Sequence, residues 1–120
     1  MQSIPVDVAK IVFLAMSAPR PKLKDRRTGE VATDREGRTV TALRCACVPT
    51  DESSEDIPEM ELIQTVAEVP PIRRGTPVQV TGLVARPYAF KDDSGAQRAG
   101  VTFWAEAIGP VGAPSKASSS

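Results

Sequence analysis

The chain has 120 residues, enough for one domain with one hydrophobic core and too few for two ordinary domains. Its 11 prolines and 8 glycines favour short strands and turns over a helical bundle, and basic and acidic residues cancel at fifteen each. The chain has no histidine, which excludes Ser-His-Asp and Cys-His catalysis and most zinc sites. No apolar run is long enough to span a membrane and no signal-peptide pattern opens the chain, so we expect a soluble, cytoplasmic, non-catalytic protein.

Three strands are predicted in the first half of the chain. Residues Val8–Met16 are apolar enough to form a strand that is covered on both faces. Residues Arg38–Val48 alternate with a period of two, and the face that carries Leu43 and Cys45 is predicted to be core. Residues Met60–Val69 are predicted as a third strand, with a short helix as the less favoured alternative.

The two cysteines lie two residues apart on the second predicted strand. Cys45 and Cys47 would therefore point to the same face, about 6.7 Å apart along the strand, which is a poor geometry for a mutual disulfide. Two thiols do not make a metal site. We expect small buried thiols in a reducing compartment and no cofactor.

Charge is segregated along the chain. Residues 19–44 carry eight basic and four acidic side chains, a net charge of +4, whereas residues 51–68 carry seven acidic and no basic ones. Charge runs are usually solvated loops, and a binding function requires the basic segments to converge in space. The basic stretch from Arg20 to Arg27 could also be a mobile segment that becomes ordered on binding.

Residues Arg74–Pro110 are predicted to form two strands joined by a polar loop. Val78, Val80 and Val84 would share one face, and Gly82 interrupts the first strand as glycines do at a bulge or tight bend. Asp92 and Asp93 fit a turn better than a catalytic carboxylate pair. Residues 110–120 are small, polar and interrupted by proline, which predicts a flexible tail after a domain spanning residues 1–109.

Basic and aromatic residues cluster where the first of these two strands ends. Arg86, Tyr88, Phe90 and Lys91 stand together just before the turn. Such clusters are typical of single-stranded nucleic-acid binding, although loop aromatics can instead cover the end of a barrel. For Trp104, core packing, a subunit contact and base stacking are all open.

Five strands with one long acidic loop fit an all-β, five-stranded antiparallel Greek-key barrel, the OB-fold. The closing segment resembles the bacterial single-stranded-DNA-binding protein family and its OB-fold relatives among replication accessory proteins. The pattern is a glycine-led strand, a second glycine, a basic and aromatic run, a short turn and a closing strand, here RRGTPVQVTGLVARPYAFKDDSGAQRAGVTFWAEAI. A weaker match lies upstream, in RRTGEVATDREGRTVTALRCACV. The chain is also similar to small actinobacterial regulatory proteins of plasmids and mobile elements.

The resemblance implies a protein that binds single-stranded DNA in the replication, transfer or maintenance of a plasmid or mobile element. Arg86 with Tyr88 or Phe90 would take the place of the family's base-stacking group. An alternative from a different class is a regulatory OB module that binds a replication or transfer protein. A homodimer or higher homo-oligomer formed by an exposed first or last strand is expected in either case. The residues predicted to contact nucleic acid are Lys22, Lys24, Arg26, Arg27, Arg44, Arg73, Arg74, Arg86, Tyr88, Phe90, Lys91 and Trp104.

Overall fold

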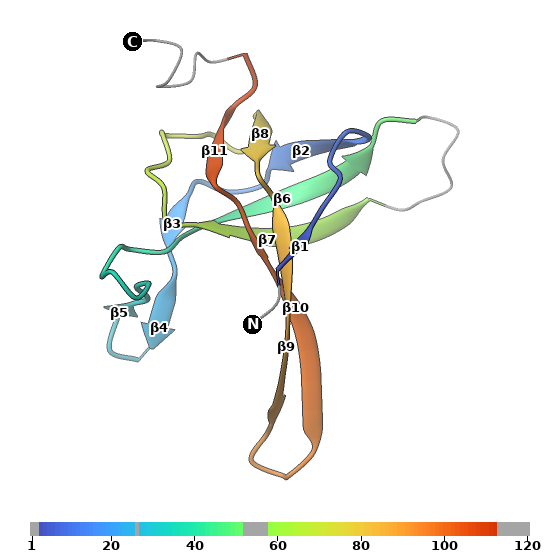
Figure 1. Ribbon diagram of the computed structural model, residues 1–120. Coiled ribbons are helices and arrows are strands. Elements are labelled where there is room, and N and C mark those ends of the chain that lie inside the picture. The colour runs from blue at the N-terminus through green and yellow to red at the C-terminus, as the bar shows by residue number, and fades with distance from the viewer. Residues whose placement is uncertain (1–2, 26, 52–57, 113–120) are drawn as a thin grey trace.

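The computed structural model describes residues 3–25, 27–51 and 58–112, and these form eleven strands and no helix (Figure 1). In chain order the strands are β1 Ile4–Pro5, β2 Ile11–Ala15, β3 Arg20–Pro21, β4 Leu23–Asp25, β5 Glu30–Val31, β6 Thr41–Pro49, β7 Glu59–Thr65, β8 Pro77–Thr81, β9 Val84–Lys91, β10 Gln97–Trp104 and β11 Ala107–Pro110. The all-β prediction is confirmed for this part of the chain, and the third predicted segment is a strand.

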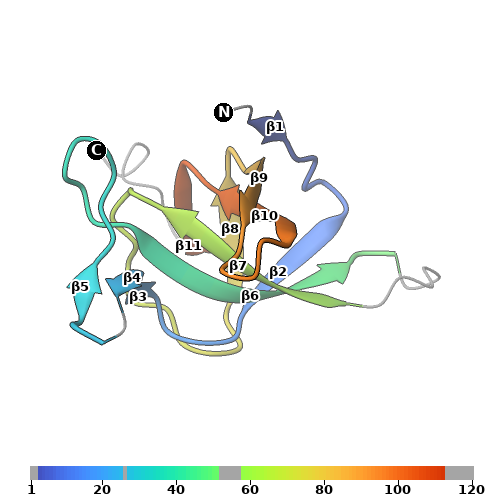
Figure 2. The same ribbon diagram turned by 90° about the horizontal axis from the view of Figure 1, so that it is seen from below.

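Eight of these strands follow one another across a single curled sheet in the order β1-β9-β10-β7-β6-β2-β8-β11. Strands β8 and β9 are separated by only two residues, yet they lie near opposite ends of this order. The same holds for β10 and β11. The sheet must therefore curl to bring its two ends together, and Figure 2 shows this half-barrel from a second direction.

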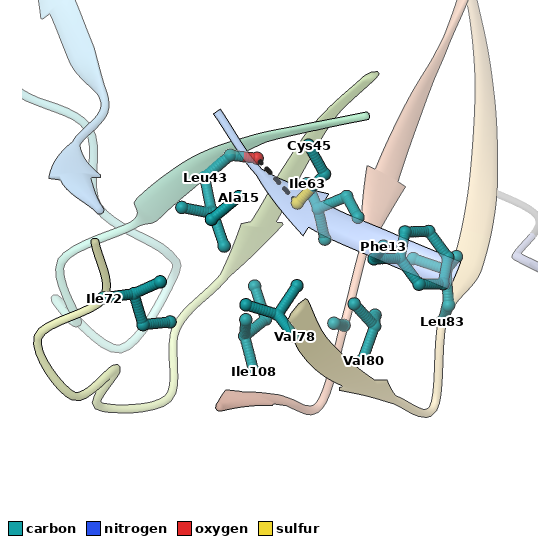
Figure 3. Packing of buried hydrophobic residues seen from close by; sticks show 11 residues of the cluster. Phe13, Ala15, Leu43, Cys45, Ile63, Ile72, Val78, Val80, Leu83 and Ile108 are labelled. Carbon is teal, nitrogen blue, oxygen red and sulfur yellow. Dashed lines mark hydrogen bonds between the residues drawn. The ribbon is translucent and has the colours of Figure 1, made fainter. Parts of the chain in front are cut away.

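The core lies inside the curl (Figure 3). Leu43 and Cys45, from β6, are fully buried, as the alternation in that strand predicts. Val78 and Val80 from β8 also belong to the core, whereas Phe103 is only partly buried against it. Phe13, Ala15, Ile63, Ile72, Leu83, Ala105 and Ile108 complete the cluster.

Gly82 bends the chain between β8 and β9, as predicted. Its φ of +63° lies in the left-handed region that side chains disfavour. Val80 and Leu83 are both buried although they are three positions apart, a spacing that puts side chains on opposite faces of a regular strand, so the bend reverses the alternation. The prediction that Val84 shares the inward face of Val80 is therefore wrong, because a strand's alternation does not continue through such a bend.

Three other expectations need correction. The sheet is not wholly antiparallel, because β7 runs parallel to β10 at Ile63–Phe103 and Gln64–Trp104. Strand β2 is not covered on both faces, since Val12 is 39% exposed. Strand β2 is also not an edge strand, because β6 and β8 pair with it on either side.

The segment between β2 and β6 contains structure that periodicity did not predict. Strands β4 and β5 form a small hairpin, and Gly29 and Gly37 turn the chain with positive φ. We refer to residues 20–39 as the basic arm. At the other end of the chain, Pro110 belongs to β11 rather than to the expected tail. Residues 113–120 of that tail, Arg26, and residues 52–56 of the acidic loop lie outside the described residues.

Candidate nucleic-acid interface

A hairpin of two eight-residue strands, β9 and β10, extends away from the curled sheet (Figure 1). Its turn is built on Asp92, whose Oδ1 accepts hydrogen bonds from the backbone N–H groups of Ser94 and Ala96. Arg98 donates to Asp92 Oδ2 at 2.9 Å. The hydrogen bonds from the Ser94 hydroxyl and then from Arg98 hold the pKa of Asp92 below its usual 3.8. Asp92 is thus a turn residue, as expected from sequence.

One face of this hairpin carries a continuous row of cations and aromatic rings. Arg86, Tyr88 and Phe90 alternate along β9, and directly across from them on β10 stand Thr102, Gly100 and Arg98. Trp104 continues the same face of β10. We call this row the aromatic strip, and its members are Arg86, Tyr88, Phe90, Arg98 and Trp104.

Two of the three rings of the strip, Tyr88 and Phe90, are exposed. Tyr88 is 41% exposed and Phe90 52%, so neither ring plugs the end of the barrel, and both lie on a strand rather than in a loop. Their centroids are 6.0 Å apart with planes inclined by 17°. Tyr88 lies over Gly100, where an added Cβ would come within 2.6 Å of the ring carbon Cζ. The glycine thus allows the tyrosine ring to lie flat against β10.

At the base of the hairpin, Arg86 and Trp104 form a fixed pair. The Arg86 guanidinium lies 5.1 Å from the centre of the indole, and its Nε donates to Ser3 Oγ at 3.1 Å. Trp104 is half-buried, and its Nε1 donates to Thr102 Oγ1 at 3.1 Å. Trp104 is therefore outside the core cluster and belongs to the outward face of the sheet.

The basic arm meets the strip at Arg86. An open hollow of about 510 Å³ is lined by Arg86 together with Ser3, Asp34, Arg35, Glu36 and Arg38. Arg38 is held by Asp34 and Glu36 at 2.6 and 3.2 Å, and Lys24 lies 3.8 Å from Glu30. The arm and the hairpin do converge, but acidic neighbours offset part of the positive charge.

One cation of the arm reaches across the sheet. Lys22 Nζ donates to Gln64 Oε1 at 2.7 Å, and the Gln64 side chain is only 2% exposed. Gln64 is the register partner of Trp104, so this contact joins the arm to the strip. Sequence reasoning missed Gln64, Gly100 and Arg98, because only the strand register reveals them.

The remaining predicted contacts lie apart from the strip. Arg44 is exposed on β6 opposite Leu62, and Lys91 alternates with Phe90 and so faces the other side of the hairpin. Arg27 is exposed near the tip of the arm. Arg73 and Arg74 lie in the turn before β8, where Thr76 N–H donates to the carbonyl of Arg73.

The thiols carry no reactive feature. Burial, and then the neighbouring Cys47, raises the pKa of Cys45 to about 12. Burial, followed by Glu61 and Glu59, raises the pKa of Cys47 to about 11. Both cysteines are free, and Cys45 is buried as predicted, whereas Cys47 is only partly buried. In the described ranges no group of His, Cys, Asp or Glu side chains has the arrangement of a metal site.

No family model and no curated protein matches this chain. Within the part of the chain that the structure describes, no helix has the length and hydropathy to cross a membrane.

Proposed function

We propose that this protein is an OB-like barrel that binds single-stranded nucleic acid without catalysis. The observation that carries the proposal is the aromatic strip, in which exposed Tyr88 and Phe90 lie between Arg86 and Arg98 on one face of a projecting hairpin. Every base has a π-face, so such rings bind unstacked bases with little regard to sequence. Bases in a duplex are stacked on each other and do not offer that face.

The strand pairing supports the OB-like part of the proposal. If β8 with β9, and β10 with β11, are counted as two bent strands, and the two-residue strands β1 and β3 are left out, the sheet reduces to five strands. In this count the first strand pairs with the second and fourth, and the third runs parallel to the fifth. OB-folds bind oligonucleotides at the face of strands two and three and at the loops between strands one and two and strands four and five. The basic arm and the β9–β10 hairpin occupy those two connections.

A homo-oligomer is also part of the proposal. Beyond Ala85, β9 has a strand partner on one edge only among the described residues, and β11 pairs only with β8. Open strand edges are the usual route to pairing between copies.

The test is a pair of fluorescence-anisotropy titrations, with a dye-labelled oligo-dT and with a duplex of the same length. We expect tighter binding to the single strand and a loss of affinity as salt rises, since cations that contact phosphates release counterions. Equal binding to both at low salt, or binding to neither, would contradict the proposal.

Failure to bind either nucleic acid would favour the second candidate, a module that binds a replication or transfer protein. The other face of the hairpin favours this candidate. It is formed by Pro87, Ala89, Ala99 and Val101, all exposed, with Val101 at 50%. Apolar patches of this kind mark protein-binding surfaces when they are contiguous.

A further inference from the structure

Lys22 is hydrogen-bonded to the buried residue Gln64, which lies on the sheet face that carries Trp104. Gln64 and Trp104 are register partners in the parallel pair of β7 and β10, so their side chains are neighbours on one face. The Lys22 ammonium donates to Gln64 Oε1 at 2.7 Å and therefore contacts the residue next to Trp104 on that face. Lys22 comes from the basic arm, 42 residues away in sequence.

A different cation contacts the indole itself. The Arg86 guanidinium covers the ring at 5.1 Å and is itself held by Ser3. The indole is fixed in turn by the hydrogen bond from its Nε1 to Thr102 Oγ1. Arg86 is thus oriented against the indole, and Lys22 is oriented against Gln64, the register neighbour of Trp104.

The buried partner of Lys22 is the unusual feature. Burying an amide is unfavourable unless it is hydrogen-bonded, and an apolar residue at position 64 would avoid that cost. The partner that Gln64 binds is a lysine, one of the side chains that lose the most rotamer freedom when fixed. A backbone group would satisfy the amide with less loss of entropy. The pair therefore orders an ammonium group that would otherwise move freely in solvent.

We propose that Gln64 is a positioning residue that holds Lys22 to receive one phosphate of the bound strand beside Trp104. Lys22 and Arg86 then form a phosphate subsite at the base of the hairpin, and Tyr88 and Phe90 stack bases further along it. This subsite rests on the proposed function. It makes Lys22 different in kind from the other lysine of the arm, Lys24, whose partner is the exposed Glu30.

The test measures oligo-dT affinity against salt for Lys22→Met, Gln64→Met and the double variant. The double variant replaces both hydrogen-bonding partners by apolar groups of similar size, which is close to neutral for stability. Lys10→Met is the matched control, because Lys10 is an exposed lysine in the segment before β2. Melting temperature is measured on every variant.

The salt slope is the steepness with which log affinity falls as log salt concentration rises. Loss of one phosphate contact reduces this steepness by about 0.7 for a single strand. A fourfold rise in salt would therefore weaken binding by a factor roughly three times smaller than in the wild type. We expect this for Lys22→Met and for the double variant, with Lys10→Met unchanged. Gln64→Met should weaken binding while Lys22 is still present, and adding it to Lys22→Met should weaken binding no further.

Two outcomes overturn the subsite, and they are distinguishable. If wild type binds oligo-dT and Lys22→Met lowers melting temperature without changing the salt slope, the pair is structural only and the strip remains the binding site. If wild type binds no single strand, the proposed function fails and the subsite fails with it.

Discussion

Replacement of Gly100 by alanine tests the aromatic strip without touching any of its members. An alanine Cβ would lie 2.6 Å from Tyr88 Cζ and 2.9 Å from Cε1, distances that Cβ atoms essentially never show. The backbone of β9 and β10 is held by the hairpin ladder, so the tyrosine ring must move instead. When it swings off Gly100 it also leaves its stack on Phe90.

The expected cost falls on binding rather than on folding. Loss of one base–aromatic stack is worth about 1–3 kcal/mol, or roughly 5- to 150-fold in affinity for oligo-dT. Stability should change little, because the lost packing of an exposed ring is offset by the roughly 0.5–1 kcal/mol that alanine gains over glycine within a strand.

The matched control is Gly109→Ala on β11, where an added Cβ meets no atom within 4 Å. Oligo-dT affinity and melting temperature are measured on both variants and on Phe90→Ala, which removes the most exposed ring of the strip. Unchanged affinity in Gly100→Ala and in Phe90→Ala, with both proteins folded, would refute the stacking role.

Three further predictions concern the fold and its titrating groups. Gly82→Ala should destabilise the protein by about 1–2 kcal/mol in urea unfolding, because φ is +63° there and the new Cβ also meets Glu106; no change in midpoint would contradict the bend. Because Cys45 and Cys47 have pKa values raised to about 12 and about 11, alkylation at mildly alkaline pH should be slow in the folded protein and fast in denaturant; equal rates would contradict their burial. The hydrogen bonds that lower the pKa of Asp92 favour its ionised carboxylate, which stabilises the hairpin turn above pH 3.8. This contribution should vanish as the pH falls through the pKa of Asp92 in the folded protein. NMR titration of the carboxyl and of the Ser94 amide would show the loss, and an unchanged Ser94 amide would contradict it.

Much of the sheet follows from alternation in the sequence. The pattern in residues 38–48 placed Leu43 and Cys45 in the core, because one strand face is buried and a period of two marks it. The same reasoning failed past Gly82, since a residue with positive φ resets which side chains point inward. Strands β4 and β5 were missed because two or three residues carry no period.

The candidate site likewise contains some residues that the sequence reveals and others that only the structure reveals. Tyr88 and Phe90 were recognisable because aromatic residues flanked by cations seldom belong to a core. Gly100 and Arg98 were not recognisable, because the sequence does not state which residue of β10 faces which residue of β9. In the sequence Gly100 looks like any strand glycine, and only the strand register shows that it lies opposite Tyr88. Gln64 looks like a surface residue, and only the structure shows that it pairs with Trp104 and binds Lys22.

The zero net charge of the chain is compatible with a nucleic-acid site, because some cations of the site are ion-paired and others are free to contact phosphate. Arg38 and Arg98 are held by Asp34 and Asp92, so their charge is largely offset before a ligand arrives. Arg35 and Arg86 line the hollow with no ion pair to any residue in the described ranges. Few free cations imply few phosphate contacts and therefore a shallow salt dependence. Stacking on the exposed rings must then supply most of the affinity, which is why Gly100→Ala is expected to weaken binding more than Lys22→Met.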